Sequence, residues 1–398
     1  MTINTAMKTG RLGIAMLVVA VVGSGCCCCW CHHAADAMPA PATAPVARVS
    51  ENVVRFGTDG SATSADDPGA VNVFGEMKDI KAGPVRLVGD SNFQQHTFVE
   101  QGYDADPAVD ATGKWLAFAS TRDSQHSNLY MQRVDGTAVM QLTSEAADDA
   151  APSFSPDGKQ IVFASTRSGN WQIFTMDVSG KNVTQVTTGA MQAIHPTWSP
   201  DGSRLAYCCL GSRSQQWELW TTNLQTNEKR MIGYGLFPSW SPSREVDRIA
   251  FQKPRQRGSR WFSLWTLDVI NGEATHPTEV VTSANAAILS PTWSPDGSRL
   301  AFATVMQPAQ SVAPHSKGRT DVWVVNSDGA DRQRLTDGTG TNLMPFWSGE
   351  RVYFVSDRGG AECIWSVRAD SGKAAALPVA AKKDPAAQQD ASIRDPDR

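Results

Sequence analysis

The sequence predicts an all-β protein folded as a β-propeller of six four-stranded blades, with a seven-bladed ring as the alternative. Three observations predict it: a turn motif recurs along the chain, an aromatic strand follows each copy, and there are 13 Trp against 5 Tyr. Pro-x-aromatic-Ser-Pro-Asp-Gly is complete in three copies and degenerate in three, with anchor prolines at Pro107, Pro152, Pro196, Pro238, Pro291 and Pro345. Successive anchors lie 45, 44, 42, 53 and 54 residues apart, which is about the length of one four-stranded blade.

Each repeat predicts its strands in the same order. In the turn, Pro fixes φ, Asp caps the turn locally and Gly takes a positive φ. The following strand ends in an aromatic residue, which is Phe118, Phe163, Tyr207, Phe251, Phe302 or Phe354. The third strand carries an aliphatic–aromatic pair, from Leu129-Tyr130 in the first repeat to Ile364-Trp365 in the last, and a short outer strand such as Val183 to Thr187 follows. Short strands bounded by Pro, Asp and Gly are antiparallel.

The tryptophan excess belongs to the same repeat. Eight tryptophans occupy the motif and the aliphatic–aromatic pair: Trp198, Trp220, Trp240, Trp265, Trp293, Trp323, Trp347 and Trp365. We expect them to fill the wedges between radially packed sheets, and we expect ring closure to remove open sheet edges.

The ring needs a strand from outside the six repeats. After Trp365 the last repeat has only a poor outer strand, in the sequence AAALPVA. Val73-Phe74 resembles the aliphatic–aromatic pair and residues 83–88 resemble an outer strand. We therefore expect the N-terminal segment to supply a closure strand. In the alternative, residues 52–88 begin a seventh blade.

The first 37 residues form an export signal by pattern. Lys8 and Arg11 precede the apolar run from Leu12 to Val22, and a cysteine-rich stretch follows. Three outcomes compete: a lipid on Cys26, cleavage after Ala37, or an uncleaved anchor from Leu12 to Trp30 that is long enough to span a bilayer. Residues 38–67 are expected to be a flexible linker, residues 68–381 the propeller and residues 382–398 a disordered polar tail.

The eight cysteines do not predict a disulfide framework, because five of them lie between Cys26 and Cys31. Cys28 to His32 matches the C-x-x-C-H pattern of haem attachment, but a cysteine run contains that spacing by chance. Cys208, Cys209 and Cys363 are predicted to be buried small residues, and a bridge to Cys363 is the alternative. We predict no cofactor and no metal.

The repeat resembles that of a known family. Residues 152–187 follow PxWSPDGxxIAFxSxRxGxxxIWxMDxDG nearly throughout, which resembles the PD40, WD40-like repeat of TolB-family propellers, and the resemblance covers about residues 100–370. In that family TolB is a periplasmic protein of the Tol–Pal envelope system and binds partners through its propeller. TolB carries an α/β domain before its propeller, whereas here about sixty residues without helical periodicity separate the signal from the first repeat.

Residues just before the anchor prolines should enter the innermost strands, near the central channel. Candidate ligand-binding residues at the channel mouth are Asp104, Asp106, Asp148, Asp149, His195 and Asn342, with Phe237 beside them. Carboxylates and a histidine at one mouth suit a divalent cation or a cationic ligand. The alternative is that these acids are solvated loop residues of the repeat.

A second recurring residue is an arginine four positions after the strand aromatic, at Arg122, Arg167, Arg255 and Arg358. An anion-binding ring is one reading of this repetition. The favoured interpretation is that each arginine ties down its own blade turn through hydrogen bonds to backbone carbonyls.

The function predicted from the sequence is an exported binding module that engages a protein, peptide or glycan in the cell envelope. The net charge of −4 with 19% charged residues disfavours a nucleic-acid binder, and a membrane is reached only through the N-terminus. The chain contains none of the G-x-S-x-G, P-loop or H-E-x-x-H motifs, so an enzyme is the less favoured class. A metal-assisted polysaccharide lyase or other hydrolytic enzyme, a Tol–Pal component and a haem protein are the alternatives.

Overall fold

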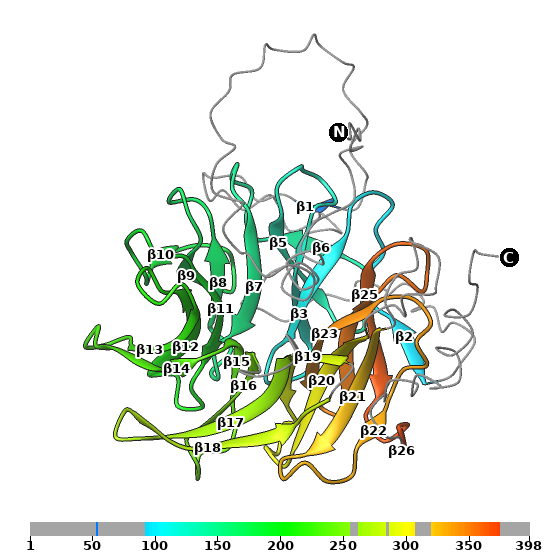
Figure 1. The fold of residues 1–398 in the computed structure, drawn as a ribbon. Helices are drawn as coiled ribbons and strands as arrows, with labels where there is room; N and C mark the ends of the chain where they lie inside the picture. Colours follow the sequence, from blue (N-terminus) through cyan, green and yellow to red (C-terminus); the bar gives the residue numbers. More distant parts are fainter. Residues whose placement is uncertain (1–52, 55–91, 255–261, 284–285, 307–319, 375–398) are drawn as a thin grey trace, which may run out of the picture.

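The computed structural model describes residues 92–254, 262–283, 286–306 and 320–374, together with the two-residue strand β1 (Val53–Val54). The regular structure of these residues is entirely β, arranged as six sheets around a central axis (Figure 1). Within these ranges there is no helix with the length and apolar character needed to cross a bilayer. The predicted signal, Cys26 and the linker, apart from Val53–Val54, fall outside the described residues.

The six sheets are six blades, each with its strands in chain order from the axis outward. Blade 1 contains β3 (Asp104–Val109), β4 (Trp115–Ser120), β5 (Asn128–Arg133) and β6 (Val139–Gln141). Blade 2 contains β7 (Asp149–Phe154), β8 (Gln160–Ser165), β9 (Gln172–Asp177) and β10 (Thr184–Gln185). Blade 3 contains β11 (Ala193–Trp198), β12 (Arg204–Leu210), β13 (Trp217–Asn223) and β14 (Lys229–Tyr234).

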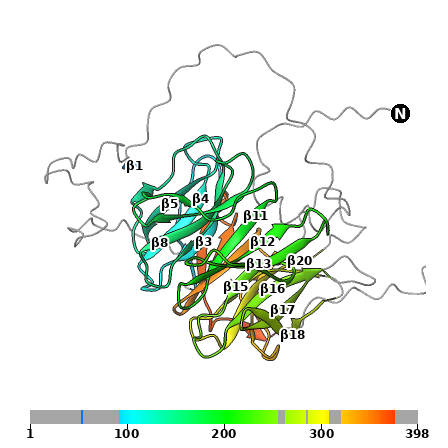
Figure 2. The same cartoon turned by 90° about the vertical axis from the view of Figure 1, so that its left-hand side faces the viewer.

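The second half of the ring repeats this order. Blade 4 contains β15 (Leu236–Trp240), β16 (Arg248–Pro254), β17 (Phe262–Ile270) and β18 (Glu273–Val281), and it stacks beside blade 3 (Figure 2). Blade 5 contains β19 (Ala286–Trp293), β20 (Arg299–Met306), β21 (Thr320–Asn326) and β22 (Gln333–Arg334). Blade 6 contains β23 (Asn342–Ser348), β24 (Arg351–Ser356) and β25 (Cys363–Arg368).

The outer strand of blade 6 comes from the start of the described chain. β2 (Phe93–Gln95) pairs antiparallel with β25, with Phe93 opposite Val367 and Gln95 opposite Trp365. This confirms six blades with an N-terminal closure strand, in place of a seventh blade. In the sequence, the closure strand β2 follows residues 83–88, which were predicted to resemble an outer strand. Residues 83–88 and Val73-Phe74 lie outside the described residues.

Two blades carry a fifth strand on their outer edge. β1 pairs in parallel with β6 in blade 1, and β26 (Lys373–Ala374) pairs antiparallel with β22 in blade 5. Both added strands come from segments outside the six repeats. They cover edges that the ring itself does not close.

The Ser-Pro-Asp-Gly turns have the geometry that the sequence predicts. In blade 2 the Ser155 hydroxyl donates to Asp157 Oδ1 at 2.6 Å, and the Gln160 N–H donates to Ser155 Oγ at 2.9 Å. Gly158 has a φ of 70°, in the region that favours glycine. The same hydrogen bonds recur around Ser199 and Ser294, so the turn joins the first and second strands of these three blades in one way.

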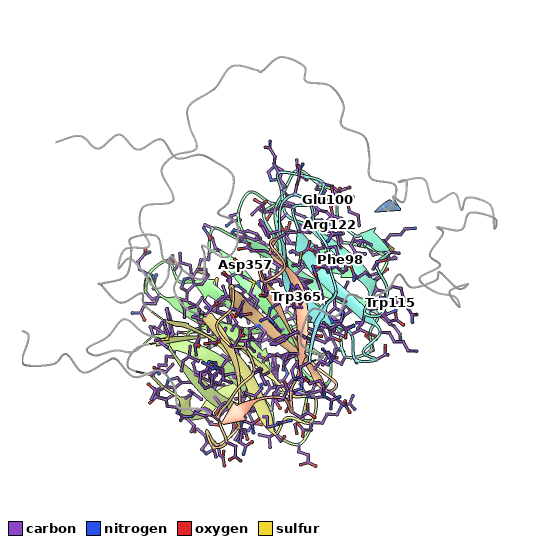
Figure 3. The ribbon with its side chains drawn as sticks, turned by 90° about the vertical axis from the view of Figure 1, so that its right-hand side faces the viewer. Phe98, Glu100, Trp115, Arg122, Asp357 and Trp365 are labelled. Atoms are coloured by element: carbon purple, nitrogen blue, oxygen red, sulfur yellow. The ribbon has the colours of Figure 1, made fainter. Side chains whose placement is uncertain are left out.

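The strand aromatics and the aliphatic–aromatic pairs meet across one strand pair in every blade. The cross-strand partners are Phe118 and Tyr130, Phe163 and Phe174, Tyr207 and Trp220, Phe251 and Trp265, Phe302 and Trp323, and Phe354 and Trp365. Most of these rings are buried, and Figure 3 shows Trp365 inside the stack of blades. Such pairs stabilise a sheet and fill the space between neighbouring sheets, as predicted for the tryptophan excess.

Tryptophans of the motif also bond blades together. The Trp198 indole N–H donates to the Ser153 carbonyl of the preceding blade at 3.1 Å, and Trp293 donates to the Ser239 carbonyl at 3.0 Å. Arg204 of blade 3 lies over the Trp240 ring of blade 4, 4.9 Å from its centroid. These contacts fix the angle between successive blades and hence the width of the ring.

Candidate functional site

The candidate site is the layer of the central channel formed by the six residues that precede the anchor prolines. A proline has no N–H for the ladder, so a strand that contains one must bulge. The register shifts at this point in all six innermost strands, for example between Ala105 and Ala108 in β3. A bulge turns a side chain away from the faces of the sheet.

All six residues of this layer adopt a left-handed backbone. Their φ values lie between 49° and 53°, and the residues are Asp106, Ala151, His195, Phe237, Ser290 and Met344, which we call the bulge ring. The first four are half-buried, whereas Ser290 and Met344 are buried. Blades 1 to 4 therefore contribute the more exposed residues of this layer.

Neighbouring members of the bulge ring contact one another around the channel. The Ala151 N–H of blade 2 donates to Asp106 Oδ2 of blade 1 at 2.9 Å. The rings of His195 in blade 3 and Phe237 in blade 4 lie 3.8 Å apart between centroids, at 34°. Each innermost strand packs on the next, and β23 packs on β3 to complete the circle.

His195 is held in one tautomer by the strand behind it. The Cys208 thiol donates to the Ile194 carbonyl at 3.3 Å, and its sulfur lies 3.6 Å from His195 Nδ1. With the thiol proton directed to the Ile194 carbonyl, we assign the ring proton to Nδ1, which leaves a lone pair on Nε2. Burial lowers the pKa of His195 to about 3, so the imidazole is neutral at pH 7.

Asp106 is the one acidic member of the bulge ring. Removal of its carboxyl group from bulk solvent raises the pKa of Asp106 to about 6, and the hydrogen bond from the Ala151 N–H opposes that rise. Asp106 borders the channel and is half-buried. At pH 7 the carboxylate is charged, and a positive ligand would stabilise it further.

Three other predicted site residues are engaged inside the blades. The side chains of Asp104 and Asp149 are fully buried and pair with arginines, Asp104 with Arg122 at 2.8 Å and Asp149 with Arg167 at 3.1 Å. In blade 6 the amide of Asn342 takes the equivalent place and its Oδ1 accepts from Arg358 at 2.9 Å. The structure does not bring these three side chains together with Asp106 and His195.

The recurring arginines hold their blade turns through side chains and not through backbone carbonyls. Arg122 Nε donates to the Ser120 hydroxyl at 3.1 Å, and its guanidinium lies 5.0 Å from the centroid of the Phe118 ring. Arg167 and Arg358 repeat this arrangement, and in Figure 3 Arg122 lies near the end of blade 1. The prediction of a backbone carbonyl as the partner was wrong for these three arginines, because each has the side chain of an acid or amide within hydrogen-bonding distance. Arg255 lies outside the described residues.

Asp148 lies between blades 1 and 2, away from the bulge ring. Its Oδ1 accepts from the Ser127 N–H at 3.0 Å and lies 3.4 Å from His126 Nδ1, and the side chain is 45% exposed. It joins two blades at their loops.

Ala151, Ser290 and Met344 are members of the bulge ring that were not among the predicted site residues. The signal for them was present, because each directly precedes an anchor proline inside a predicted strand. Ser290 matters most: its hydroxyl is buried and has no hydrogen-bond partner in the described part of the chain.

The described cysteines and acids do not form a metal cluster. Cys208, Cys209 and Cys363 are buried free thiols, as predicted. Among the described residues no three His, Cys, Asp or Glu side chains lie close enough to hold one ion. Cys28 to His32 lies outside that part of the chain.

Comparison with known proteins places the chain among the propellers. A model described as the TolB beta propeller domain (PD40) matches residues 88–261, and the Tricorn protease N-terminal beta propeller domain matches residues 177–390. The Protein TolB homolog of Chlorobium luteolum is 33% identical over 79 residues, and the Tol-Pal system protein TolB of Alcanivorax borkumensis is 29% identical over 87 residues. These matches cover 20% and 21% of this chain and 18% of each relative, so the chain spans under a fifth of those curated relatives.

The chain is also similar to solved structures. The structure of putative TolB from Agrobacterium tumefaciens is 19% identical with a TM-score of 0.49, over 70% of this chain and 91% of that one. One family model spans more than half of the chain, and the TolB model overlaps it and extends over the first blades. The chain therefore belongs to the family of the Tricorn protease N-terminal beta propeller domain, and it is a TolB-like β-propeller repeat protein.

Proposed function

We propose that the protein is an exported binding module that engages a peptide segment of an envelope protein at its central channel. The observation that supports this proposal is the bulge ring. Six equivalent positions of one backbone geometry carry six different side chains, four of them half-buried at the channel. The other repeated polar residues, such as Asp149 and Arg167, are used inside the blades.

The test is affinity capture from cross-linked envelopes with the full chain and a blocked channel. Ala151→Trp places a large ring in the channel layer and keeps the backbone N–H that Asp106 accepts. Ala274→Trp makes the same change on the exposed outer strand β18 and serves as the matched control. We expect one partner protein with the wild type and the control, and none with Ala151→Trp; equal capture by all three contradicts the proposal.

Location at the envelope is part of the same proposal. It rests on the export pattern before residue 38, and the name of one relative includes the Tol-Pal system. We propose a lipid on Cys26, tested by mass spectrometry of the purified N-terminus and by Cys26→Ser. A mature protein that begins at residue 38 would establish cleavage after Ala37 instead. Capture of Tol–Pal components alone would make the protein a component of that system.

The metal-assisted lyase hypothesis rests on His195 at the channel. Stoichiometric bound metal and lyase activity, both lost in His195→Ala, would replace the binding proposal. The haem hypothesis is tested in material exported by a host with c-type maturation, where we expect no Soret band.

A further inference from the structure

The bulge ring alternates in chemistry around the channel. Blades 1, 3 and 5 contribute polar side chains, Asp106, His195 and Ser290, whereas blades 2, 4 and 6 contribute Ala151, Phe237 and Met344. In a ring of six blades, alternate blades stand about 120° apart around the axis. The three polar residues therefore approach the channel from three evenly spaced directions.

Each polar member keeps one lone-pair atom without a partner. Asp106 Oδ2 accepts from the Ala151 N–H, and no described residue donates to Oδ1. The contact with Cys208 leaves His195 Nε2 as an acceptor with no described partner. Ser290 is 9% exposed and its hydroxyl is unpartnered among the described residues, although its N–H donates to Gln252 Oε1 at 3.2 Å.

A buried polar group without a partner costs about 1–3 kcal/mol, and this applies to the Ser290 hydroxyl. The half-buried Asp106 and His195 lie in the same layer. The layer offers a carboxylate oxygen, an imidazole nitrogen and a hydroxyl oxygen, and only the hydroxyl can also donate. A ligand that satisfies all three must donate three hydrogen bonds and carry positive charge. Asp106 and His195 are the only members of the bulge ring with a carboxylate or an imidazole, and no three His, Cys, Asp or Glu side chains of the described residues are grouped to hold a metal ion.

We propose that the bulge ring binds a primary ammonium group, such as a lysine side chain or an amino terminus, that enters along the channel axis. A primary ammonium has three N–H donors at threefold spacing, which matches the three acceptors on alternate blades. The Phe237 ring beside His195 adds an aromatic face for a cation. This inference rests on the proposed channel function and names the chemistry of the group that enters.

The probe is n-butylammonium, and n-butyltrimethylammonium is its control because it has the same charge and no N–H donors. Met344 belongs to the layer, so a ¹³C-methyl label on methionine reports binding at this place in the full chain, with Met344→Leu to assign the signal. We expect the Met344 methyl signal to shift with n-butylammonium at concentrations at least tenfold lower than with the trimethyl compound. Equal effects of the two compounds, or a shift with Mn²⁺ alone, would overturn the inference.

The variants separate charge from hydrogen bonding. Asp106→Asn keeps an acceptor for the Ala151 N–H and should weaken n-butylammonium binding at least tenfold, and Ser290→Ala should weaken it about fivefold. Asp135→Asn makes the same charge change on an exposed residue of blade 1 and should leave binding unchanged. Circular dichroism checks that each variant is folded.

The pH dependence gives a second readout. Binding should strengthen from pH 5 to pH 7 as Asp106 loses its proton, and Asp106→Asn should abolish that rise. If the wild type captures its envelope partner while no amine shifts the Met344 signal, the inference fails and the proposed function stands. If the amine binds selectively and no partner is captured, the proposed function fails and the ammonium site stands.

Discussion

His96 fastens the closure strand to both ends of the ring, so its protonation should weaken the propeller. It directly follows β2 and is 2% exposed. Its Nε2 lies 2.8 Å from the Ser366 hydroxyl of blade 6, and its Nδ1 lies 3.0 Å from the Val134 carbonyl of blade 1. A carbonyl only accepts, so Nδ1 carries the proton and Nε2 accepts from Ser366. Ser366 in turn accepts from Arg351 Nε at 2.7 Å.

Protonated His96 would stand beside a second cation. The half-buried Arg351 has no carboxylate partner in the described part of the chain, and Tyr353 packs on the His96 ring at 5.0 Å. On the blade 1 side, Arg133 and Asp135 pair with each other. Burial, opposed by the Val134 hydrogen bond and aided by Arg351, lowers the pKa of His96 from 6.5 to about 4.

The sign follows from which state binds the proton. Between pH 6.5 and 4 the unfolded chain protonates His96 and the folded chain does not, so the free energy of unfolding falls as the pH falls. The difference between the two pKa values corresponds to a loss of about 3 kcal/mol. Asp106 acts in the opposite direction because its pKa is raised, and a comparison of wild type with His96→Gln removes that contribution.

The assay is urea unfolding followed by tryptophan fluorescence at pH 7.5, 6, 5 and 4. A glutamine side chain stays neutral and restores only part of the hydrogen bonding, so His96→Gln should be about 2 kcal/mol less stable than wild type at pH 7.5. Near pH 4 the order should reverse, because wild type alone loses the histidine contribution. Stability curves that stay parallel across this range would refute the reasoning.

Three further predictions concern residues of the blades and use the same unfolding assay. Asp149→Ala should lower the free energy of unfolding by about 3 kcal/mol, because it leaves Arg167 without its buried carboxylate partner. Asp149→Asn should lower it by only about 1 kcal/mol, since the amide of Asn342 accepts from the equivalent arginine in blade 6. Gly180→Ala should cost over about 1 kcal/mol, because its φ is 79° and an added Cβ would lie 2.6 Å from the Leu142 carbonyl oxygen. Ala151→Gly should stabilise the protein by about 0.5–1 kcal/mol, because glycine relieves the left-handed φ of 50° at this position. Ala150→Gly is the control, and it should destabilise the protein because Ala150 does not have a left-handed φ. An equal effect of the two alanine changes would contradict the role given to the bulge.

The repeat made the fold predictable because its signals are local. A Ser-Pro-Asp-Gly turn forms its hydrogen bonds within five residues. The aromatic residues Phe163 and Phe174 are cross-strand partners in one hairpin. For the closure strand, the sequence indicated only that blade 6 lacks an outer strand and that the N-terminal segment supplies it. Its residues were not predictable, because Phe93–Gln95 are defined by pairing with β25 at the far end of the sequence.

The site was only partly predictable because it depends on one bulge. Asp104 and Asp106 are two residues apart and would share a face of a regular strand. The left-handed φ of 51° at Asp106 separates them, so one borders the channel and the other pairs with Arg122. A signal for that pair does exist in the repeats, since the arginine and the acid or amide occur together in blades 1, 2 and 6, whereas Ala193 in blade 3 has no arginine partner.

The side chains of the bulge ring are not those that the backbone alone would favour. Glycine and asparagine tolerate a left-handed φ best, and bulky residues in that region cost of order 1 kcal/mol each. None of the six positions is glycine or asparagine. Asp106 and His195 are of residue types that also occur there more often than most, whereas Phe237 and Met344 are not. Proline explains why the strand bulges, but it does not explain these side chains. Their role is therefore to be sought in what the channel holds, and the three unpartnered acceptors on alternate blades point to a donor at its centre.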